Sequence, residues 1–139
     1  MQIEATAEGL QRLLDSSPFT KFLNLTVVAL EAAKGRIAIK MPMRPELQRA
    51  GGHGQFQGGP VASLIDTAGD YALIASLKIP VPTINLRVDY LRPANGEFLI
   101  ADAIVRRAGK TVGVVDIDVT DSGGNLCAVG RGCYGTAAG

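Results

Sequence analysis

One stretch of this chain decides its fold: residues 51–77 read GGHGQFQGGPVASLIDTAGDYALIASL. Gly58 and Gly59 allow a tight backbone turn, and Pro60 suits the first position of a helix, where its missing N–H would have no partner in any case. No further proline occurs before Pro80, and the run is rich in Ala, Leu and Ile. The stretch therefore predicts one long helix over residues 60–77.

The predicted helix has only two charged side chains, Asp66 and Asp70. At about 100° per residue they share one arc with Ser63 and Thr67, and this arc becomes apolar one turn later. A solvated face would continue with Lys, Glu or Arg, so the sequence predicts a helix that is buried nearly all round. Two carboxylates just past a glycine-rich helix start indicate a site where a carboxylate acts beside free backbone N–H groups. A surface helix with an ordinary pair of aspartates is the alternative.

The composition is typical of one globular domain that covers residues 1–139. The chain is 47% hydrophobic and 19% charged, which leaves enough apolar surface for a core and for contacts in an oligomer. Lys and Arg number 14 and Asp and Glu number 13, with no basic block. This balance argues against nucleic acid as a partner.

The start of the chain lacks the charged and apolar regions of a signal peptide, and no apolar run reaches membrane-spanning length. We therefore expect a cytoplasmic protein without a membrane partner. Cys127 and Cys133 lie in one strand-like segment, about 20 Å apart at about 3.3 Å per residue, so they cannot bond to each other there. Because the chain has a single histidine, we assign no metal site.

The other segments predict a short helix and six strands. Leucines at helical spacing predict an amphipathic helix over about residues 7–15. Residues 25–32 and 36–41 predict a β-hairpin, and strands over residues 83–91, 98–107, 111–120 and 125–134 predict an antiparallel meander. Strict alternation in residues 83–91 puts Thr83, Asn85, Arg87 and Asp89 on one face. The economical arrangement is an α+β fold, with an antiparallel sheet wrapped around one long central helix.

Four groups of residues resemble a known family when they are taken together. They are Leu13-Leu14 with Ser17-Pro18-Phe19, Gly58-Gly59 with Leu64 and Asp66, Asn85 with Tyr90-Leu91-Arg92-Pro93-Ala94, and Arg106-Arg107 with Gly109-Lys110. Together they resemble the hotdog-fold acyl-CoA thioesterases, in the branch of the phenylacetate-pathway PaaI and 4-hydroxybenzoyl-CoA thioesterases. The resemblance covers nearly the whole chain and implies a hotdog fold.

The resemblance also implies catalytic roles. The backbone N–H of Gly58 would polarise the thioester carbonyl, and Asp66 would act as general base for water or as nucleophile. Thr83 would help to place the water or a carboxylate from a partner subunit. Gln57 stands where most relatives have His, and Gly51 stands where they have Asn. Gln57 can hydrogen-bond the substrate or orient water, but it cannot exchange a proton at neutral pH.

Further residues are implied in substrate binding. Arg92, Arg107 and Lys110 are expected to meet the phosphates of CoA, since a near-neutral protein needs local cations to hold a polyanion. Asp70 is expected to line the acyl pocket or to raise the proton affinity of Asp66 by like-charge repulsion. The remaining candidates for substrate binding are His53, Gln55, Gly59, Asn85 and Gly109.

The resemblance therefore implies a hydrolase that converts an acyl-CoA or aryl-CoA thioester to the free acid and CoA, with no cofactor. It further implies a link to phenylacetic acid degradation and a homodimer or homotetramer with the site at the subunit interface. A non-catalytic acyl-CoA-binding hotdog protein is the alternative, because Gln57 and Gly51 depart from the family pattern. A hotdog hydratase is a further alternative, which would need a closely spaced His and Asp.

Overall fold

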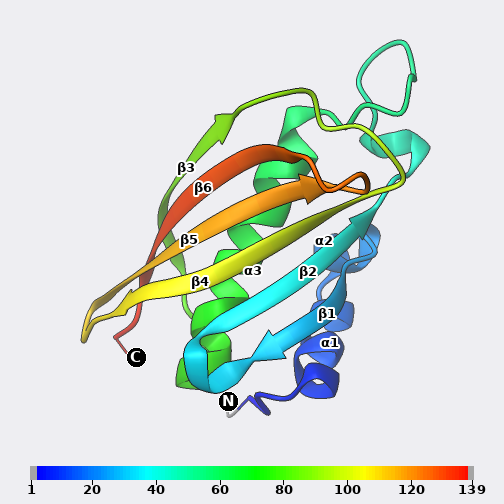
Figure 1. The fold of residues 1–139 in the computed structure, drawn as a ribbon. Coiled ribbons are helices and arrows are strands. Elements are labelled where there is room, and N and C mark those ends of the chain that lie inside the picture. The colour runs from blue at the N-terminus through cyan, green and yellow to red at the C-terminus, as the bar shows by residue number, and fades with distance from the viewer. Residues whose placement is uncertain (1–2, 138–139) are drawn as a thin grey trace.

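A long helix, α3 (Gly58–Leu77), lies against one face of a six-stranded antiparallel sheet that wraps around it (Figure 1). The computed structural model describes residues 3–137. The strands are β1 (Thr26–Glu31), β2 (Arg36–Pro42), β3 (Thr83–Tyr90), β4 (Phe98–Ala108), β5 (Val112–Asp121) and β6 (Leu126–Gly135). The other helices are α1 (Ala7–Ser16), α2 (Pro18–Phe22) and the short 3-10 turns η1 (Ala32–Lys34) and η2 (Pro45–Leu47). This confirms the predicted α+β architecture.

Helix α3 begins two residues earlier than the sequence predicts. Gln57 is the N-cap residue, and its side-chain oxygen accepts a hydrogen bond from the N–H of Gly59. Pro60 is the third helical residue, where its missing N–H still belongs to the unpaired first turn. At the other end Lys78 adopts a left-handed conformation with φ 62°, and its N–H donates to the carbonyl of Ile74 at 2.7 Å. The helix therefore has a satisfied cap at both ends.

The order of strands in the sheet is β1-β2-β4-β5-β6-β3. The predicted hairpin of β1 and β2 is confirmed, and β4, β5 and β6 form a meander as predicted. Strand β3 does not pair with β4, however, so the prediction of a meander that includes β3 was wrong. After α3 the chain places β3 beside β6, and β2 pairs with β4. This crossover puts strands on both sides of α3, which closes the sheet around an apolar helix.

A bulge at the start of β3 corrects the predicted alternation. The register with β6 shifts between Thr83, which is opposite Tyr134, and Asn85, which is opposite Cys133. The Tyr134 side chain is fully buried under the sheet, so Thr83 also faces α3, whereas Asn85 lies on the outer face. The inserted residue is Ile84, which is 57% exposed. The bulge thus turns the Thr83 hydroxyl towards the helix.

The core lies between α3 and the inner face of the sheet. In β2, for example, Ile37, Ile39 and Met41 point inward and are fully buried, while the residues between them face outward. In α3 the buried residues occur on nearly every side of the helix and include Val61, Leu64, Ile65, Ala68, Gly69, Tyr71, Ala72, Leu73, Ile74 and Ala75. The apolar character of α3 therefore stabilises the whole domain, as its sequence predicts.

Helix and sheet pack tightly at Gly69, where the Tyr134 side chain of β6 lies against α3. The Tyr134 hydroxyl donates to the backbone carbonyl of Asp66 at 3.0 Å. A Cβ atom on Gly69 would lie 2.2 Å from that hydroxyl oxygen and 3.1 Å from the Cδ1 atom of Ile117. Gly69 is therefore needed for space, and the phenol fixes the turn of α3 that carries Asp66.

We predict that Gly69→Ala lowers the free energy of unfolding. Alanine is normally better than glycine inside a helix by about 1 kcal/mol, whereas an overpacked core costs about 1–3 kcal/mol. Urea denaturation of the variant measures which effect is larger. Tyr134→Phe in the Gly69→Ala background removes the clashing oxygen and is expected to restore part of the loss. A more stable Gly69→Ala variant would contradict the close packing.

Candidate active site

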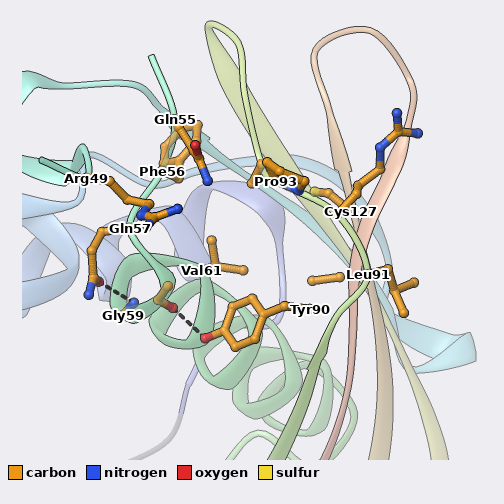
Figure 2. Close-up of a pocket in the computed structure, with 14 residues that line it drawn as sticks. Arg49, Gln55, Phe56, Gln57, Gly59, Val61, Tyr90, Leu91, Pro93 and Cys127 are labelled. Carbon is orange, nitrogen blue, oxygen red and sulfur yellow. Dashed lines mark hydrogen bonds between the residues drawn. The ribbon is translucent and has the colours of Figure 1, made fainter. Parts of the chain in front are cut away.

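A cavity of about 630 Å³ opens at the N-terminal end of α3 (Figure 2). Its walls come from the loop before α3, the first turn of α3, the end of β3 with the segment after it, and the start of β6. The lining residues are Arg49, Gln55, Phe56, Gln57, Gly58, Gly59, Val61, Tyr90, Leu91, Arg92, Pro93, Ala94, Cys127 and Ala128. Segments far apart in the sequence therefore meet at the helix start, where a partial positive charge accumulates.

Backbone hydrogen bonds fix the loop that forms one wall of this cavity. The N–H of Gln57 donates to the carbonyl of Leu47 at 2.8 Å, and the N–H of Phe56 donates to that of Ala94 at 2.8 Å. On the opposite wall the N–H of Leu91 donates to the carbonyl of Cys127 at 2.9 Å. The cavity is thus held by main-chain contacts on both sides.

The cap by Gln57 pairs one N–H group of the first turn of α3 and leaves another unpaired. Its side-chain oxygen takes the N–H of Gly59 (Figure 2). The N–H of Gly58 has no acceptor within the helix, and it donates to none of the described residues. Gly58 lines the cavity, so one unpaired donor at the positive end of a 20-residue helix is available to a ligand oxygen there.

Tyr90 binds the carbonyl of the peptide group whose N–H, that of Gly59, is bound by Gln57. Its hydroxyl donates to the carbonyl of Gly58 at 2.6 Å, and its ring lies over the first turn of α3 (Figure 2). This carbonyl and the N–H of Gly59 belong to one peptide unit. A hydrogen bond to the carbonyl increases the positive charge on that N–H, since linked hydrogen bonds polarise one another. Tyr90 therefore orients and polarises the cap.

Asp66 lies two turns further along α3 and is half-buried. The Thr83 hydroxyl donates to its Oδ1 atom at 2.8 Å, and this contact joins two residues of the same chain. The bulge in β3 and the Tyr134 hydrogen bond place the two groups. A carboxylate oriented by a hydroxyl in this way can accept a proton from water with its second oxygen.

The structure does not bring Asp66 and Gly58 of one chain together. Eight residues at 1.5 Å rise separate them by about 12 Å along the helix axis. A base that activates water for attack must be within hydrogen-bond reach of that water, which itself must lie about 3 Å from the carbonyl. Within one chain, a carbonyl bound at Gly58 is therefore out of reach of Asp66.

Asp70 has a different environment from Asp66. It faces a separate cavity, and its Oδ1 atom is buried without a hydrogen-bond partner among the described residues. Burial, with a smaller contribution from the charge of Asp66, raises the pKa of Asp70 to about 7. Near neutral pH this carboxyl therefore exists in both protonation states.

The other predicted binding residues are scattered over the chain. Arg107, Gly109 and Lys110 lie at the turn between β4 and β5, where they line a third cavity of about 360 Å³. That turn is at the far end of the sheet from the end of β3 and the start of β6, which line the cavity at Gly58. His53 is exposed in the loop before α3, and Asn85 is exposed on the outer face of β3. By contrast Gln55, Gly59 and Arg92 do line the cavity at Gly58.

Two lining residues with functional groups were missed from the sequence. Arg49 lines the cavity, and Tyr90 bonds to the helix start. The alternation of residues 83–91 places Tyr90 on the face opposite Asn85, which was the available signal. For Arg49 no local pattern was available, because the loop before α3 determines its position.

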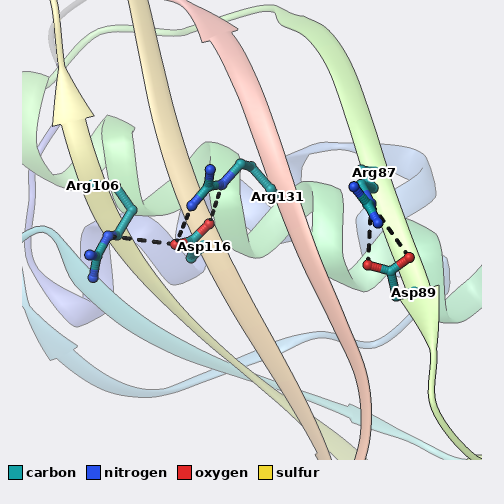
Figure 3. A network of polar contacts seen from close by, with 5 residues as sticks. All are labelled: Arg87, Asp89, Arg106, Asp116 and Arg131. Atoms are coloured by element: carbon teal, nitrogen blue, oxygen red, sulfur yellow. Dashed lines mark hydrogen bonds and ion pairs between the residues drawn. The ribbon is translucent and has the colours of Figure 1, made fainter.

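Charges on the outer face of the sheet are paired with each other (Figure 3). Asp116 accepts hydrogen bonds from Arg131 at 2.6 and 2.9 Å and has Arg106 at 3.5 Å, while Arg87 pairs with Asp89 at 3.2 Å. The hydrogen bond from Arg131 lowers the pKa of Asp116. These exposed pairs contribute little to stability.

The described part of the chain contains neither a metal-binding cluster nor a membrane-spanning helix. No group of His, Cys, Asp and Glu in residues 3–137 is arranged to hold a metal ion. No helix in the same residues has the length and apolar character to cross a membrane. Cys127 and Cys133 are both free thiols.

The sequence profile of the thioesterase superfamily matches residues 53–128, which contain the cavity loop, α3 and most of the strands after it. A Halobacterium salinarum protein described as a proposed esterase is 40% identical over 136 residues, covering 90% of this chain and 88% of the relative. Human acyl-coenzyme A thioesterase 13 is 30% identical over 108 residues, with 76% of each chain covered. The chain therefore belongs to the thioesterase superfamily.

Solved structures agree with this assignment. A protein from the thioesterase superfamily superposes with a TM-score of 0.87 at 34% identity, covering 93% of this chain and 96% of the other. The Escherichia coli PaaI protein from the phenylacetic acid degradation operon superposes with a TM-score of 0.82 at 26% identity, with 95% and 93% covered. The predicted hotdog fold and the predicted likeness to PaaI are both confirmed.

We predict a pH-dependent stability that originates in Asp70. Its pKa is raised from 3.8 to about 7, so between these values the folded chain binds a proton that the unfolded chain has released. The contribution of Asp70 to the free energy of unfolding should therefore fall by roughly 4 kcal/mol as the pH rises from about 4 to about 7. Asp70→Asn removes this titration, so the variant should gain stability relative to wild type as the pH rises. Urea denaturation at several pH values measures the difference, and a difference independent of pH would refute the assignment.

Proposed function

We propose that this protein hydrolyses an acyl-CoA or aryl-CoA thioester to the free acid and CoA. The observation that carries the proposal is the unpaired N–H of Gly58 at a cavity on the N-terminus of α3, on the same helix as a carboxylate held by Thr83. The relatives named acyl-coenzyme A thioesterases support it. The cavity, at about 630 Å³, is within the usual range for small-molecule sites.

The reaction assigns one task to each group. The thioester oxygen accepts a hydrogen bond from Gly58, and the helix end stabilises the negative charge that develops on that oxygen. Asp66 takes a proton from water as the water oxygen bonds to the carbonyl carbon, while Thr83 orients the carboxylate. The C–S bond then breaks and CoA leaves as a thiolate. Direct attack by Asp66 as nucleophile, followed by hydrolysis of the resulting anhydride, uses the same residues.

The separation of about 12 Å along α3 means that this chemistry needs two copies of the chain. We propose a homodimer in which Gly58 of one copy faces Asp66 of the other. Strand β3 is at one edge of the sheet with its outer edge unpaired, Ile84 on it is exposed, and the arc of α3 around Asp66 is only half-covered. A second copy would cover these surfaces, and a dimer of dimers is compatible with this arrangement.

Pairing of two β3 strands would also account for the distant cations. Antiparallel pairing puts the start of one β3 beside the end of the other. The turn with Arg107 and Lys110 lies at the Thr83 end, so it would approach the cavity of the second copy at its Tyr90 end. Together with Arg49 and Arg92, which line that cavity, these side chains would meet the phosphates of CoA.

We predict that Gly58→Pro lowers kcat by about 10² to 10³, the usual loss for one oxyanion-hole donor. Proline is tolerated at the first helical position and removes only the N–H, and Gln57 already has the extended ψ of 150° that a residue before proline needs. Gly58→Ala is the matched control, because it keeps the N–H and adds a Cβ at 3.2 Å from the Tyr90 hydroxyl, a contact that a small shift of the side chain relieves. Thiol release measures both variants, and equal losses would argue against an oxyanion donor at Gly58.

We predict that Asp66→Asn lowers kcat by roughly 10² to 10⁴ with little change in substrate binding, because it keeps the shape of the side chain and removes the base. Asp70→Asn should retain most of the turnover. Asp118→Asn, an exposed change on the outer face of the sheet, is the control for charge alone. If Asp70→Asn is inactive and Asp66→Asn is not, the base is one helical turn further along.

We also predict that mixing the two inactive variants restores activity. In a heterodimer of Gly58→Pro and Asp66→Asn, one of the two composite sites keeps both native groups. Random exchange of subunits should recover about a quarter of the wild-type rate, since half of the dimers are mixed and each has one intact site. A site built within one chain would give no recovery.

The alternative proposal is a non-catalytic acyl-CoA-binding protein. It is favoured by Gln57, because this residue caps the helix and carries no exchangeable proton. A panel of phenylacetyl-, hydroxybenzoyl- and medium-chain acyl-CoA esters separates the two functions: binding without thiol release from any ester would support the alternative. A hydratase would instead add water to an enoyl-CoA and release no thiol.

A further inference from the structure

A second cavity, of about 270 Å³, lies on the side of α3 that faces the N-terminal helices. Thr67, Asp70 and Ile74 of α3 form one wall, and residues of α1, α2 and the turn between them form another. At about 30 Å³ per water molecule, it has room for roughly nine water-sized groups. It shares no lining residue with the cavity at Gly58.

Five hydroxyls line this second cavity; those of Ser17 and Tyr71 can donate to a ligand, whereas the other three are already occupied as donors. Ser16, Thr20 and Thr67 each donate their hydroxyl hydrogen to a backbone carbonyl, at 2.7, 2.6 and 2.8 Å. Their oxygen lone pairs remain free. At these three hydroxyls a ligand that brings a hydrogen-bond donor is therefore the better match.

Asp70 strengthens this preference for a donor. Its Oδ1 atom is buried and has no partner among the described residues. A buried polar atom without a partner is costly, and a donor from a ligand would remove that cost. The raised pKa of about 7 reports the same lack of compensation. The cavity thus contains a group that a ligand can satisfy and that the chain itself does not.

The position of Asp70 connects the cavity to the proposed chemistry. Asp70 is one turn beyond Asp66, about 6 Å along α3, and Thr67, the neighbour of Asp66, lines the cavity. An acyl group whose carbonyl lies at Asp66 can extend over Asp70 with five or more carbon atoms. The walls beyond it are apolar, with Leu13 and Ile74 among them.

We propose that this second cavity binds the distal end of the acyl group, and that Asp70 selects acyl chains that end in a hydrogen-bond donor such as a hydroxyl. The proposal rests on the proposed thioester hydrolysis and adds the substrate class. Asp70 acts here as a specificity-determining residue, because it contacts the acyl end and not the reacting carbonyl.

The test compares matched CoA esters that differ only in a terminal hydroxyl: hexanoyl- with 6-hydroxyhexanoyl-CoA, and octanoyl- with 8-hydroxyoctanoyl-CoA. For wild type, kcat/KM should favour the hydroxylated member of at least one pair by about tenfold to a hundredfold, the usual range for a hydrogen bond to a charged group. Asp70→Leu should abolish this preference. Asp70→Asn keeps an acceptor oxygen and should retain part of it. Asp118→Leu, on the outer face of the sheet, should leave it unchanged.

A pH series on wild type tests the same contact without a variant. The preference for the hydroxylated ester should rise as the pH passes 7, because a carboxylate accepts a stronger hydrogen bond than a carboxylic acid. Asp66 and Tyr71 on α3, Asp15 on α1 and Tyr134 on β6 are the titratable groups nearby. Both esters of a pair share them, so their titration cancels in the ratio.

The outcomes separate the two proposals. The role of this cavity is overturned if thiol is released but the ratio of kcat/KM between the two esters of a pair is the same in wild type and Asp70→Leu and does not change with pH. If neither these esters nor the phenylacetyl- and hydroxybenzoyl-CoA esters release thiol, the proposed hydrolysis fails. Calorimetric titration of the same ester pairs then tests the proposed role of the cavity without catalysis. Equal Kd values within both pairs overturn that role, and tighter binding of the hydroxylated ester that Asp70→Leu removes supports it.

Discussion

The rise of the helix between Gly58 and Asp66 is the constraint on which the rest of the structure depends. Helix α3 is apolar on nearly every side, so the sheet must wrap around it, and the arc with Ser63, Asp66 and Asp70 is the part left half-covered. The helix also holds its free N–H end and its carboxylate about 12 Å apart. A single copy can enclose the helix but cannot bring the N–H of Gly58 and the carboxylate of Asp66 to one substrate carbonyl. The fold that stabilises the chain is therefore also the reason why the proposed hydrolysis would need a second copy.

The elements of the fold could be predicted because their signals are local. Alternation in β2, turn residues between the later strands, and the uninterrupted apolar run of α3 each depend on neighbouring residues. The position of β3 beside β6 could not be predicted, since it depends on how the sheet closes around α3. The bulge that turns Thr83 inward has the same origin. It is set by the register with Tyr134, which lies about fifty residues later in the chain.

The candidate site also has parts that local sequence predicts and parts that depend on distant segments. The helix start at Gly58 and the carboxylate of Asp66 follow from one stretch of sequence, and the resemblance to thioesterases added Thr83. The environment of Asp70 could not be predicted, because its cover comes from α1 and α2 and is unrelated to the helix pattern. The sequence placed Asp70 in the same arc as Asp66, but it did not show that Asp70 is separately buried, with an unpartnered Oδ1 atom and a raised pKa.

Gln57, which cannot exchange a proton, is compatible with the proposed turnover. Its side-chain oxygen is occupied by the N–H of Gly59, so the N–H of Gly58 stays free and the oxyanion donor does not depend on a histidine at position 57. Gln57 cannot supply a proton to a leaving group. Thiols are much more acidic than water or alcohols and leave readily as thiolates, however, so thioester cleavage needs no acid at this position. The amide therefore removes a proton donor that the proposed reaction does not require, and it places the whole proton transfer on Asp66.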